Sequence, residues 1–263
     1  MLTRRQILQT GAAAAALPAM AAFADPRWSP DADFLRLVEN ELTSQLHDRT
    51  TAAALAPVEV DVGFTWSLPT LPAVQLNSIV AYSFGNRPNA ASGNTSSSGG
   101  NQAALPDPGP INELLADAVH QIYSLNPVPV YAQWEIARFL VSKYGMNSSN
   151  LFSVEPLIAA DGTITYLSTD GVAVAIIAHA GGTAALGNVG VVGHRDHAKR
   201  CIETSVARQM KAYAAAEVSL PVVYDPLSGQ SWTRNRHLYL VHDMYAQMYM
   251  RFAALSAQAF PHG

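Results

Sequence analysis

The sequence predicts an α/β fold, in which a mostly parallel, Rossmann-like sheet carries helices on both of its faces. Beyond residue 75, short apolar stretches alternate with longer amphipathic ones. A short stretch that is apolar throughout is typical of a parallel strand, and parallel strands need a crossover helix between them. The chain is 49% hydrophobic and only 14% charged, which indicates a compact core rather than disorder.

The first residues have the features of an export signal. Arg4 and Arg5 precede an apolar run over 11–23 and a cleavage site of small residues before Asp25. This pattern predicts a twin-arginine signal peptide over 1–24, and therefore a periplasmic protein that is exported already folded. Because the apolar run is too short to cross a bilayer, we expect no transmembrane segment after cleavage.

The remaining residues, 25–263, are sufficient for one large α/β domain. Removal of Arg4 and Arg5 leaves 14 basic against 20 acidic residues, a net charge of about −6. Since there is also no basic run, nucleic acid is not an expected partner. The single cysteine, Cys201, excludes an intramolecular disulfide and cysteine-rich metal sites, and its helical context predicts a packed side chain.

The first part of this domain predicts a helix beginning near Asp31, a strand over 58–66 and a second strand over 76–83. Asn, Ser, Gly and Pro dominate the segment 86–109 that follows. Such a composition builds no core and predicts a mobile loop. A loop of this length is either a disordered insertion or a lid over the strand end that precedes it.

From Pro110 onward the pattern becomes regular, and Pro110 itself is well suited to begin a helix. The predicted helices cover 111–125, 134–144, 168–180, a segment from His194 or Asp196 to about Ala216, and 238–257. The predicted strands cover 128–132, 151–154, 189–192 and 220–224.

Candidate site residues follow the predicted strands, because ligands of open α/β sheets bind at the carboxyl ends of the strands. Arginines there suit an anionic group, and histidine suits proton transfer if there is chemistry. The candidates for ligand binding are Ser83, Gly85, Asn86, Arg87, Ser168, Thr169, Arg195 and Arg200. The candidates for a catalytic role are His194 and His197. Gln133 and Glu135 follow the strand predicted over 128–132, and Glu135 is one of several carboxylates that could supply a general base, although no spacing selects a pair.

The run Gly193-His-Arg-Asp-His197 is the most unusual of these segments, since consecutive polar residues open a helix directly after a buried strand. A helix N-terminus with an arginine and two imidazoles favours an anion, although the same residues also suit a helix cap. A metal ion held by His194, Asp196 and His197 is an alternative, with His237, His242 or Asp243 as further ligands. The sequence contains no Gly-x-Ser-x-Gly, Gly-x-Gly-x-x-Gly or Walker motif.

This arrangement resembles the SanA/ElyC/YdcF-like family of envelope proteins over residues 76–225. The family combines a Rossmann-like fold with a glycine loop after its first strand, a Ser/Thr helix start and a later His-x-x-Arg helix. The matching positions are 79–85 for the strand and loop, Ser168 and Thr169 for the helix start, and 189–200 for the last strand and helix, with His197 and Arg200 as the family's histidine and arginine. The sequence departs from the family where Tyr166-Leu167 replaces an acidic residue and where 86–109 is inserted.

The resemblance implies a cell-envelope role and a small anionic ligand, phosphorylated or nucleotide-like, at the carboxyl edge of the sheet. Two alternatives remain open. One is a periplasmic, metal-assisted hydrolase that uses His194, Asp196 and His197. The other is a non-catalytic envelope binding protein. The sequence does not decide between enzyme and binder, and it names no cofactor.

Overall fold

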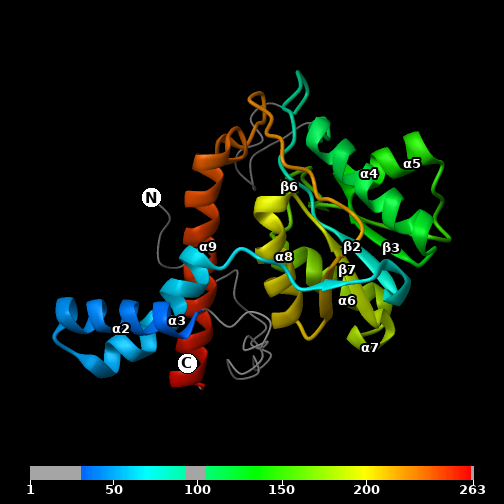
Figure 1. Ribbon diagram of the computed structural model, residues 1–263. Helices are drawn as coiled ribbons and strands as arrows, with labels where there is room; N and C mark the ends of the chain where they lie inside the picture. The colour runs from blue at the N-terminus through cyan, green and yellow to red at the C-terminus, as the bar shows by residue number, and fades with distance from the viewer. Residues whose placement is uncertain (1–30, 93–104, 262–263) are drawn as a thin grey trace.

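A six-stranded, all-parallel sheet forms the centre of the computed structural model, which describes residues 31–92 and 105–261. The strand order is β1-β8-β7-β2-β3-β4, and the fold is Rossmann-like (Figure 1). The predicted fold class is confirmed, whereas the predicted signal peptide at 1–24 lies outside the described residues. The strands are β1 (Thr70–Leu71), β2 (Ser78–Ala81), β3 (Val130–Gln133), β4 (Leu151–Val154), β7 (Asn188–Val192) and β8 (Lys211–Ala215).

Helices cover both faces of the sheet because its central strand is apolar on both sides. In β2, Ile79 and Ala81 join a buried cluster with α4 and α5, whereas Val80 packs into a second cluster with α6 and α8. The two pairs of helices lie on opposite sides of the sheet in Figure 1. These helices are α4 (Pro110–Leu125), α5 (Trp134–Tyr144), α6 (Thr169–Ala180) and α8 (Arg195–Ala207).

The helices α5 and α8 begin directly beyond the carboxyl ends of β3 and β7, so their N-termini lie at the same edge of the sheet. Ser168 caps α6 by accepting a hydrogen bond from the Gly171 N–H. The remaining short elements are α7 (Thr183–Leu186), the 3-10 turns η3 (Ala73–Gln75) and η4 (Ser231–Thr233), and an antiparallel hairpin of β5 (Leu157–Ile158) and β6 (Ile164–Thr165). Among the described residues, no helix is both long and apolar enough to span a membrane.

The prediction of one helix to about Ala216 is wrong, because α8 ends at Ala207 and β8 follows it. The β8 segment, Lys-Ala-Tyr-Ala-Ala, has the high alanine content of a helix. It forms a strand because its backbone pairs in parallel with β7 on one side and β1 on the other. Tertiary pairing here outweighs intrinsic helix propensity, which is a weak preference of tenths of a kcal/mol per residue.

The strand predicted over 58–66 is also wrong, because residues 58–64 belong to the helix α3 (Arg49–Phe64). Asp48 begins this helix by accepting hydrogen bonds from the N–H groups of Thr50 and Thr51. The alternating valines that suggest a strand are buried in the helix, which packs against α2 (Ala32–Leu46) and α9 (Arg236–Ala259). Because α3 is packed on more than one side, its valines are buried as part of a helix, and their alternation in the sequence does not mark one face of a half-exposed strand.

The segment 220–224, predicted as a strand, is irregular. Its carbonyl groups bond to the start of α8 rather than to a neighbouring strand. The Pro221 carbonyl accepts from the Arg195 N–H at 2.9 Å, and the Val223 carbonyl bonds to the His194 ring at 3.0 Å. Pro221 also lacks the N–H that a central strand would need.

The ends of the 86–109 segment are held in place. Arg87 and Asp107 exchange two backbone hydrogen bonds of 2.8 Å, and the Asn89 side chain donates to both Leu105 and Asp107. Residues 93–104, the middle of the loop predicted to be mobile, lie outside the described residues.

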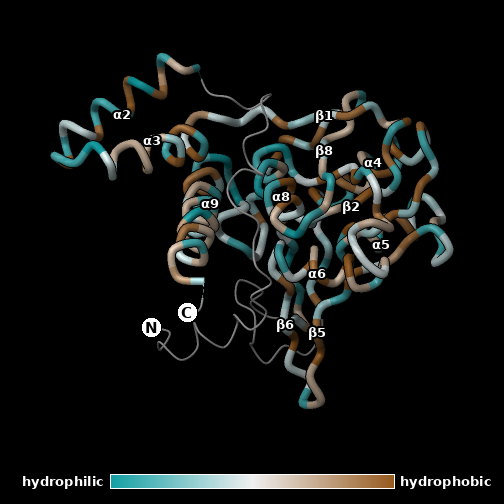
Figure 2. The backbone as a smooth tube through the Cα atoms, turned by 90° about the horizontal axis from the view of Figure 1, so that it is seen from below, coloured by the Kyte–Doolittle hydropathy of each residue, from teal (hydrophilic) through white to brown (hydrophobic). Residues whose placement is uncertain are grey.

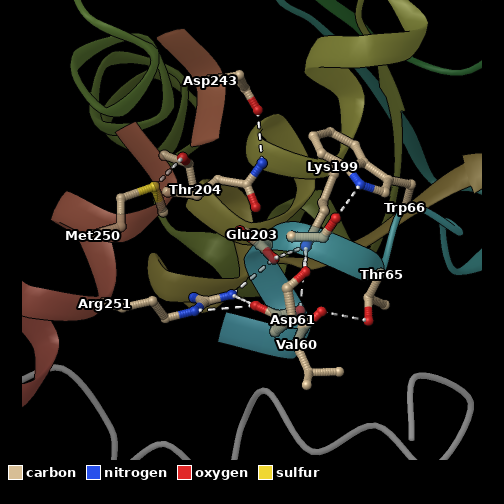
Figure 3. Close-up of polar contacts among 12 residues, drawn as sticks. Val60, Asp61, Thr65, Trp66, Lys199, Glu203, Thr204, Asp243, Met250 and Arg251 are labelled. Atoms are coloured by element: carbon tan, nitrogen blue, oxygen red, sulfur yellow. Dashed lines mark hydrogen bonds and ion pairs between the residues drawn. The ribbon is translucent and has the colours of Figure 1, made fainter. Parts of the chain in front are cut away.

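A cluster of buried charges attaches α3 to the rest of the protein. Lys199, which is 1% exposed, lies 3.2 Å from the Asp61 carboxylate. Arg251 donates to Asp61 and to Glu203, as Figure 3 shows. The α2–α3 hairpin otherwise stands away from the sheet in both views (Figures 1 and 2).

Candidate functional site at the carboxyl edge of the sheet

The loop after β2 is the centre of the candidate site, because its backbone binds two neighbouring elements. The Ser83 N–H donates to the Gln133 side chain at the end of β3, and the Phe84 N–H donates to the buried Asn112 of α4. The Phe84 ring stacks on His194, with 4.1 Å between the ring centroids. The carboxyl ends of β2, β3 and β7 are therefore joined in one packed unit.

Gly85 adopts a φ of +69°, and an added Cβ would lie 2.7 Å from the Ser228 hydroxyl and 2.8 Å from that of Thr233. Both the left-handed backbone and this close approach require glycine. The next residue, Asn86, is buried, and its carbonyl accepts from the Gly229 N–H at 2.8 Å. Gly85 and Asn86 are both predicted to bind the ligand, but in this conformation they face the segment around 225–233 instead.

Arg87, another predicted ligand residue, forms a two-point ion pair with the buried Asp225, at 2.7 and 2.9 Å. The hydrogen bonds from Arg87 hold the pKa of Asp225 below its usual value. Because this guanidinium already has a carboxylate partner, its charge is neutralised locally. Arg87 thus anchors the irregular segment that covers the strand ends.

His194 is fully buried and serves as the N-cap of α8. Its Nδ1 accepts from the Asp196 N–H at 3.3 Å, so the proton resides on Nε2, which donates to the Val223 carbonyl. Burial lowers its pKa to about 4, so the ring is neutral at pH 7. With both nitrogens engaged, His194 has no nitrogen to offer a ligand in this arrangement.

The carboxylate of Asp196, in the first turn of α8, pairs with two guanidinium groups. Arg195 Nε lies 3.1 Å and Arg236 Nε 3.0 Å from its carboxylate, and the Tyr224 hydroxyl donates at 2.7 Å. Although burial opposes ionisation, these hydrogen bonds hold the pKa of Asp196 below its usual value. The side chains of Arg195 and Arg236 are 43% and 60% exposed, whereas that of Asp196 is 5% exposed. Two positive charges against one negative charge leave one unit of positive charge that faces solvent.

Arg200 lies in α8 and links this helix to the start of α6. Its Nη1 donates to the Thr169 hydroxyl at 3.1 Å, and its Nε donates to Asp243 of α9 at 2.6 Å. The third side of the guanidinium donates to the Tyr239 hydroxyl at 3.2 Å. Thr169 and Arg200, which the sequence proposes together, are therefore in direct contact.

His197 lies one turn before Arg200, and it is 5% exposed. Its buried Nδ1 faces the Asp243 carboxylate at 3.6 Å and has no hydrogen-bond partner within normal distance among the described residues. Burial and the neighbouring charge of Arg200 lower its pKa to about 4. His197 is thus a neutral imidazole at pH 7, and because Nδ1 faces a carboxylate, which can only accept, the ring proton belongs on Nδ1.

Glu135, at the start of α5, is the most perturbed carboxyl group of this edge. It is 3% exposed, and burial raises its pKa to about 8, partly offset by hydrogen bonds from Ser83 and Asn86. Among the described residues, neither its Oε2 nor the buried Nε1 of the neighbouring Trp134 has a hydrogen-bond partner. Trp134 and Tyr166 line a shallow recess that has no room for a water molecule. Perturbed and unpaired polar groups of this kind are typical of functional sites.

The proposed metal ligands do not form a metal site in this arrangement. Both nitrogens of His194 and the carboxylate of Asp196 have protein partners, as described above. Within 31–92 and 105–261, no group of three or more His, Cys, Asp or Glu side chains is placed to hold a metal ion. The three-residue set His194, Asp196 and His197 is therefore not supported as a metal centre by this geometry.

The structure brings most of the predicted residues to one edge, but it separates them into groups. Ser168 is an exposed cap, Arg87 faces Asp225, and Arg195 faces Asp196. Sequence reasoning assigned no role to the residues that complete the site, apart from weighing Glu135 as a general base and Asp243 as a metal ligand. These residues are Asn112, Gln133, Glu135, Tyr224, Asp225, Arg236, Tyr239 and Asp243. Only Gln133 and Glu135 have a sequence signal, because they directly follow a predicted strand.

Comparison with protein-family models, curated proteins and solved structures gave no match. The class of the protein is therefore defined by its own fold and edge geometry: a Rossmann-like α/β protein with a polar, partly covered carboxyl edge.

Proposed function

We propose that the protein binds a small anionic ligand, phosphorylated or nucleotide-like, at the first turn of α8. The observation that carries this proposal is the convergence of Arg195 and Arg236 on the single carboxylate of Asp196. The surplus positive charge lies at a helix N-terminus, where the helix dipole also favours anions. Both guanidinium groups are partly exposed, so a phosphate oxygen can reach them without unfolding the site.

The contact between Thr169 and Arg200 supports the same proposal, because it brings together two of the three motifs by which the sequence resembles the SanA/ElyC/YdcF-like family. Within this proposal the protein is an exported periplasmic member of that type with a role in the cell envelope. Localisation tests the export step. Replacing Arg4 and Arg5 by lysine retains the protein in the cytoplasm if the twin-arginine route is used, whereas unchanged export contradicts it.

Calorimetric titration with inorganic phosphate and with adenosine monophosphate tests the binding step. We expect Arg236→Gln to weaken binding at least about 10-fold, because a charge-assisted hydrogen bond contributes roughly 1.5–3 kcal/mol. Arg36→Gln is the matched control, since Arg36 is a similarly exposed arginine that pairs with Asp33 on α2. Equal binding to wild type and Arg236→Gln, or no binding of either probe, would contradict the proposal.

If the ligand is also turned over, His197 is the group that accepts or donates the proton, because its ring is neutral at pH 7 and its Nδ1 faces the Asp243 carboxylate, which orients the ring. His197→Gln then abolishes turnover and leaves binding within a few-fold of wild type. A protein that binds the phosphate probe but shows no hydrolysis, with or without His197, is the non-catalytic binding protein.

A further inference from the structure

The outward face of the C-terminal helix α9 is apolar and uncharged. Its large exposed hydrophobic residues recur at helical spacing, so they form one continuous stripe about 25 Å long. The stripe consists of Leu238 (44% exposed), Val241 (70%), Tyr245 (72%), Tyr249 (56%), Phe252 (64%) and Leu255 (36%).

Every acidic residue, lysine and arginine of α9 is turned away from this stripe. Arg236 reaches Asp196, Asp243 reaches Arg200, and Arg251 reaches Asp61 and Glu203. Asp243 and Arg251 are buried, and Arg236, although 60% exposed, is directed to Asp196 at the first turn of the 24-residue helix. The stripe itself therefore contains no acidic residue, lysine or arginine. Exposed apolar stripes of this size on a folded protein mark interaction surfaces.

We infer that this stripe is the interface between two copies of the chain, which pair their α9 helices in antiparallel orientation across a two-fold axis. The inference does not depend on the proposed ligand. An uncharged face suits self-association, because a two-fold axis places like residues near one another and would oppose equal charges. With the axis between Tyr245 and Tyr249, the Tyr245 ring lies opposite Tyr249 of the partner subunit.

The exposed area of the stripe agrees with an interface between two copies of the chain. An aromatic side chain contributes about 150–250 Å² when fully buried, so the exposed parts of the six stripe residues amount to roughly 700 Å², close to the about 800 Å² that each partner gives to a stable interface. Tyrosine and phenylalanine are also the residues that interfaces enrich. A membrane surface is disfavoured, because helices that lie on membranes carry lysine and arginine along their polar flank.

Sedimentation velocity of the full chain tests the inference. We expect a dimer at tens of micromolar, and a dissociation constant raised at least about 30-fold by Tyr245→Lys combined with Tyr249→Lys. The matched control is Leu157→Lys combined with Ile158→Lys, in the β5–β6 hairpin, where the residues are 61% and 64% exposed. This control remains dimeric, and thermal unfolding shows that each variant is folded.

A charge-swap experiment distinguishes self-pairing from other partners. The variant with Tyr245→Glu and Tyr249→Glu is monomeric alone, but it associates with the double lysine variant when the two are mixed. A monomeric wild-type chain, a dimer that the lysine substitutions leave intact, or no association in the mixture would each overturn the inference. So would binding of the monomeric chain to neutral phosphatidylcholine vesicles through Tyr245, which would assign the stripe to a membrane.

Discussion

Asp61 and Arg251 are 190 positions apart in the sequence, yet the Arg251 guanidinium donates to the Asp61 carboxylate at 2.5 Å. The same nitrogen donates to Glu203 at 2.8 Å, and Lys199 adds a second positive charge. Two cations and two anions are thus balanced between α3, α8 and α9 (Figure 3). The cluster therefore adds polar contacts between the α2–α3 hairpin and the helices α8 and α9 to the apolar packing of α3 on α9.

Replacing Arg251 by methionine is expected to lower the free energy of unfolding by about 3–5 kcal/mol, because it leaves the buried Glu203 and the partly buried Asp61 with Lys199 as their one remaining cation in this cluster. Chemical denaturation monitored by circular dichroism measures this change. Lys143→Met is the control, since Lys143 pairs with Glu113 and Asp117 at the surface, where ion pairs contribute little. Similar losses of stability in the two variants would show that the buried cluster contributes no more than a surface ion pair.

Glu135 is expected to make the protein less stable as the pH rises. Its pKa is about 8 in the folded protein and near 4.5 when unfolded, so between these values the folded state holds a proton that the unfolded state has lost. The stability difference between wild type and Glu135→Gln should therefore shift against wild type by about 1.4 kcal/mol per pH unit across this window.

Thermal unfolding of both proteins from pH 4.5 to 9 measures this effect. His194 and His197, whose pKa values are lowered to about 4, act in the opposite sense between pH 4 and 6.5, but they are common to both proteins and cancel in the difference. A pH-independent difference would mean that Glu135 ionises normally in the folded state.

Gly85→Ala is expected to destabilise the protein by more than Gly145→Ala, although both glycines have positive φ angles of 69° and 63°. The backbone strain is similar, about 1–2 kcal/mol for a residue with a Cβ. At Gly85 the added Cβ would also contact two hydroxyl groups within 2.8 Å, whereas no atom of the described residues lies within 4 Å of the Cβ at Gly145. Equal midpoints of urea unfolding for the two variants would contradict the close packing of the loop after β2.

Asp243→Asn is expected to lower the pKa of His197 still further below about 4, because the Asp243 carboxylate is the nearby charge that favours the imidazolium. Titration of the histidine ring protons by NMR measures this shift. His194 serves as an internal control, since its pKa is set by burial and by Asp196 rather than by Asp243. The variant should also lose about 3–5 kcal/mol of stability, because the buried guanidinium of Arg200 loses its carboxylate. An unchanged His197 pKa would show that the Asp243 carboxylate has no effect on the His197 ring.

Local sequence patterns sufficed for the elements whose own residues determine them. The helix α5 begins and ends at Trp134 and Tyr144 as predicted, because Gly145 provides the left-handed cap that the sequence indicates. The strand β7 was equally clear, since an uninterrupted apolar run is typical of a strand buried on both faces. Patterns failed where distant partners decide, as in residues 58–64 of α3, which alternate like a strand but form a helix, and in β8, which is alanine-rich but forms a strand.

The candidate site shows the same division. Strand ends identified Ser83, Gln133, Glu135 and His194 as neighbours, because the carboxyl ends of parallel strands meet at one edge. Asp225 and Arg236 could not be placed there from the sequence, and Asp243 entered only as a further ligand of the alternative metal site, since each reaches the edge from an irregular segment or from the last helix. Their partners are 138, 40 and 43 positions away, distances at which no local pattern connects two residues.

The sequence by itself determined that the chain forms a parallel sheet covered by helices, and that polar groups gather where its strands end, because periodicity and strand direction are local properties. Only the tertiary structure decided how the charges are paired. It neutralised Arg87 and Arg200, left a surplus charge at Asp196, and buried Glu135 without a full set of partners. Those outcomes depend on desolvation and on contacts between distant segments, which exist only once the chain has folded.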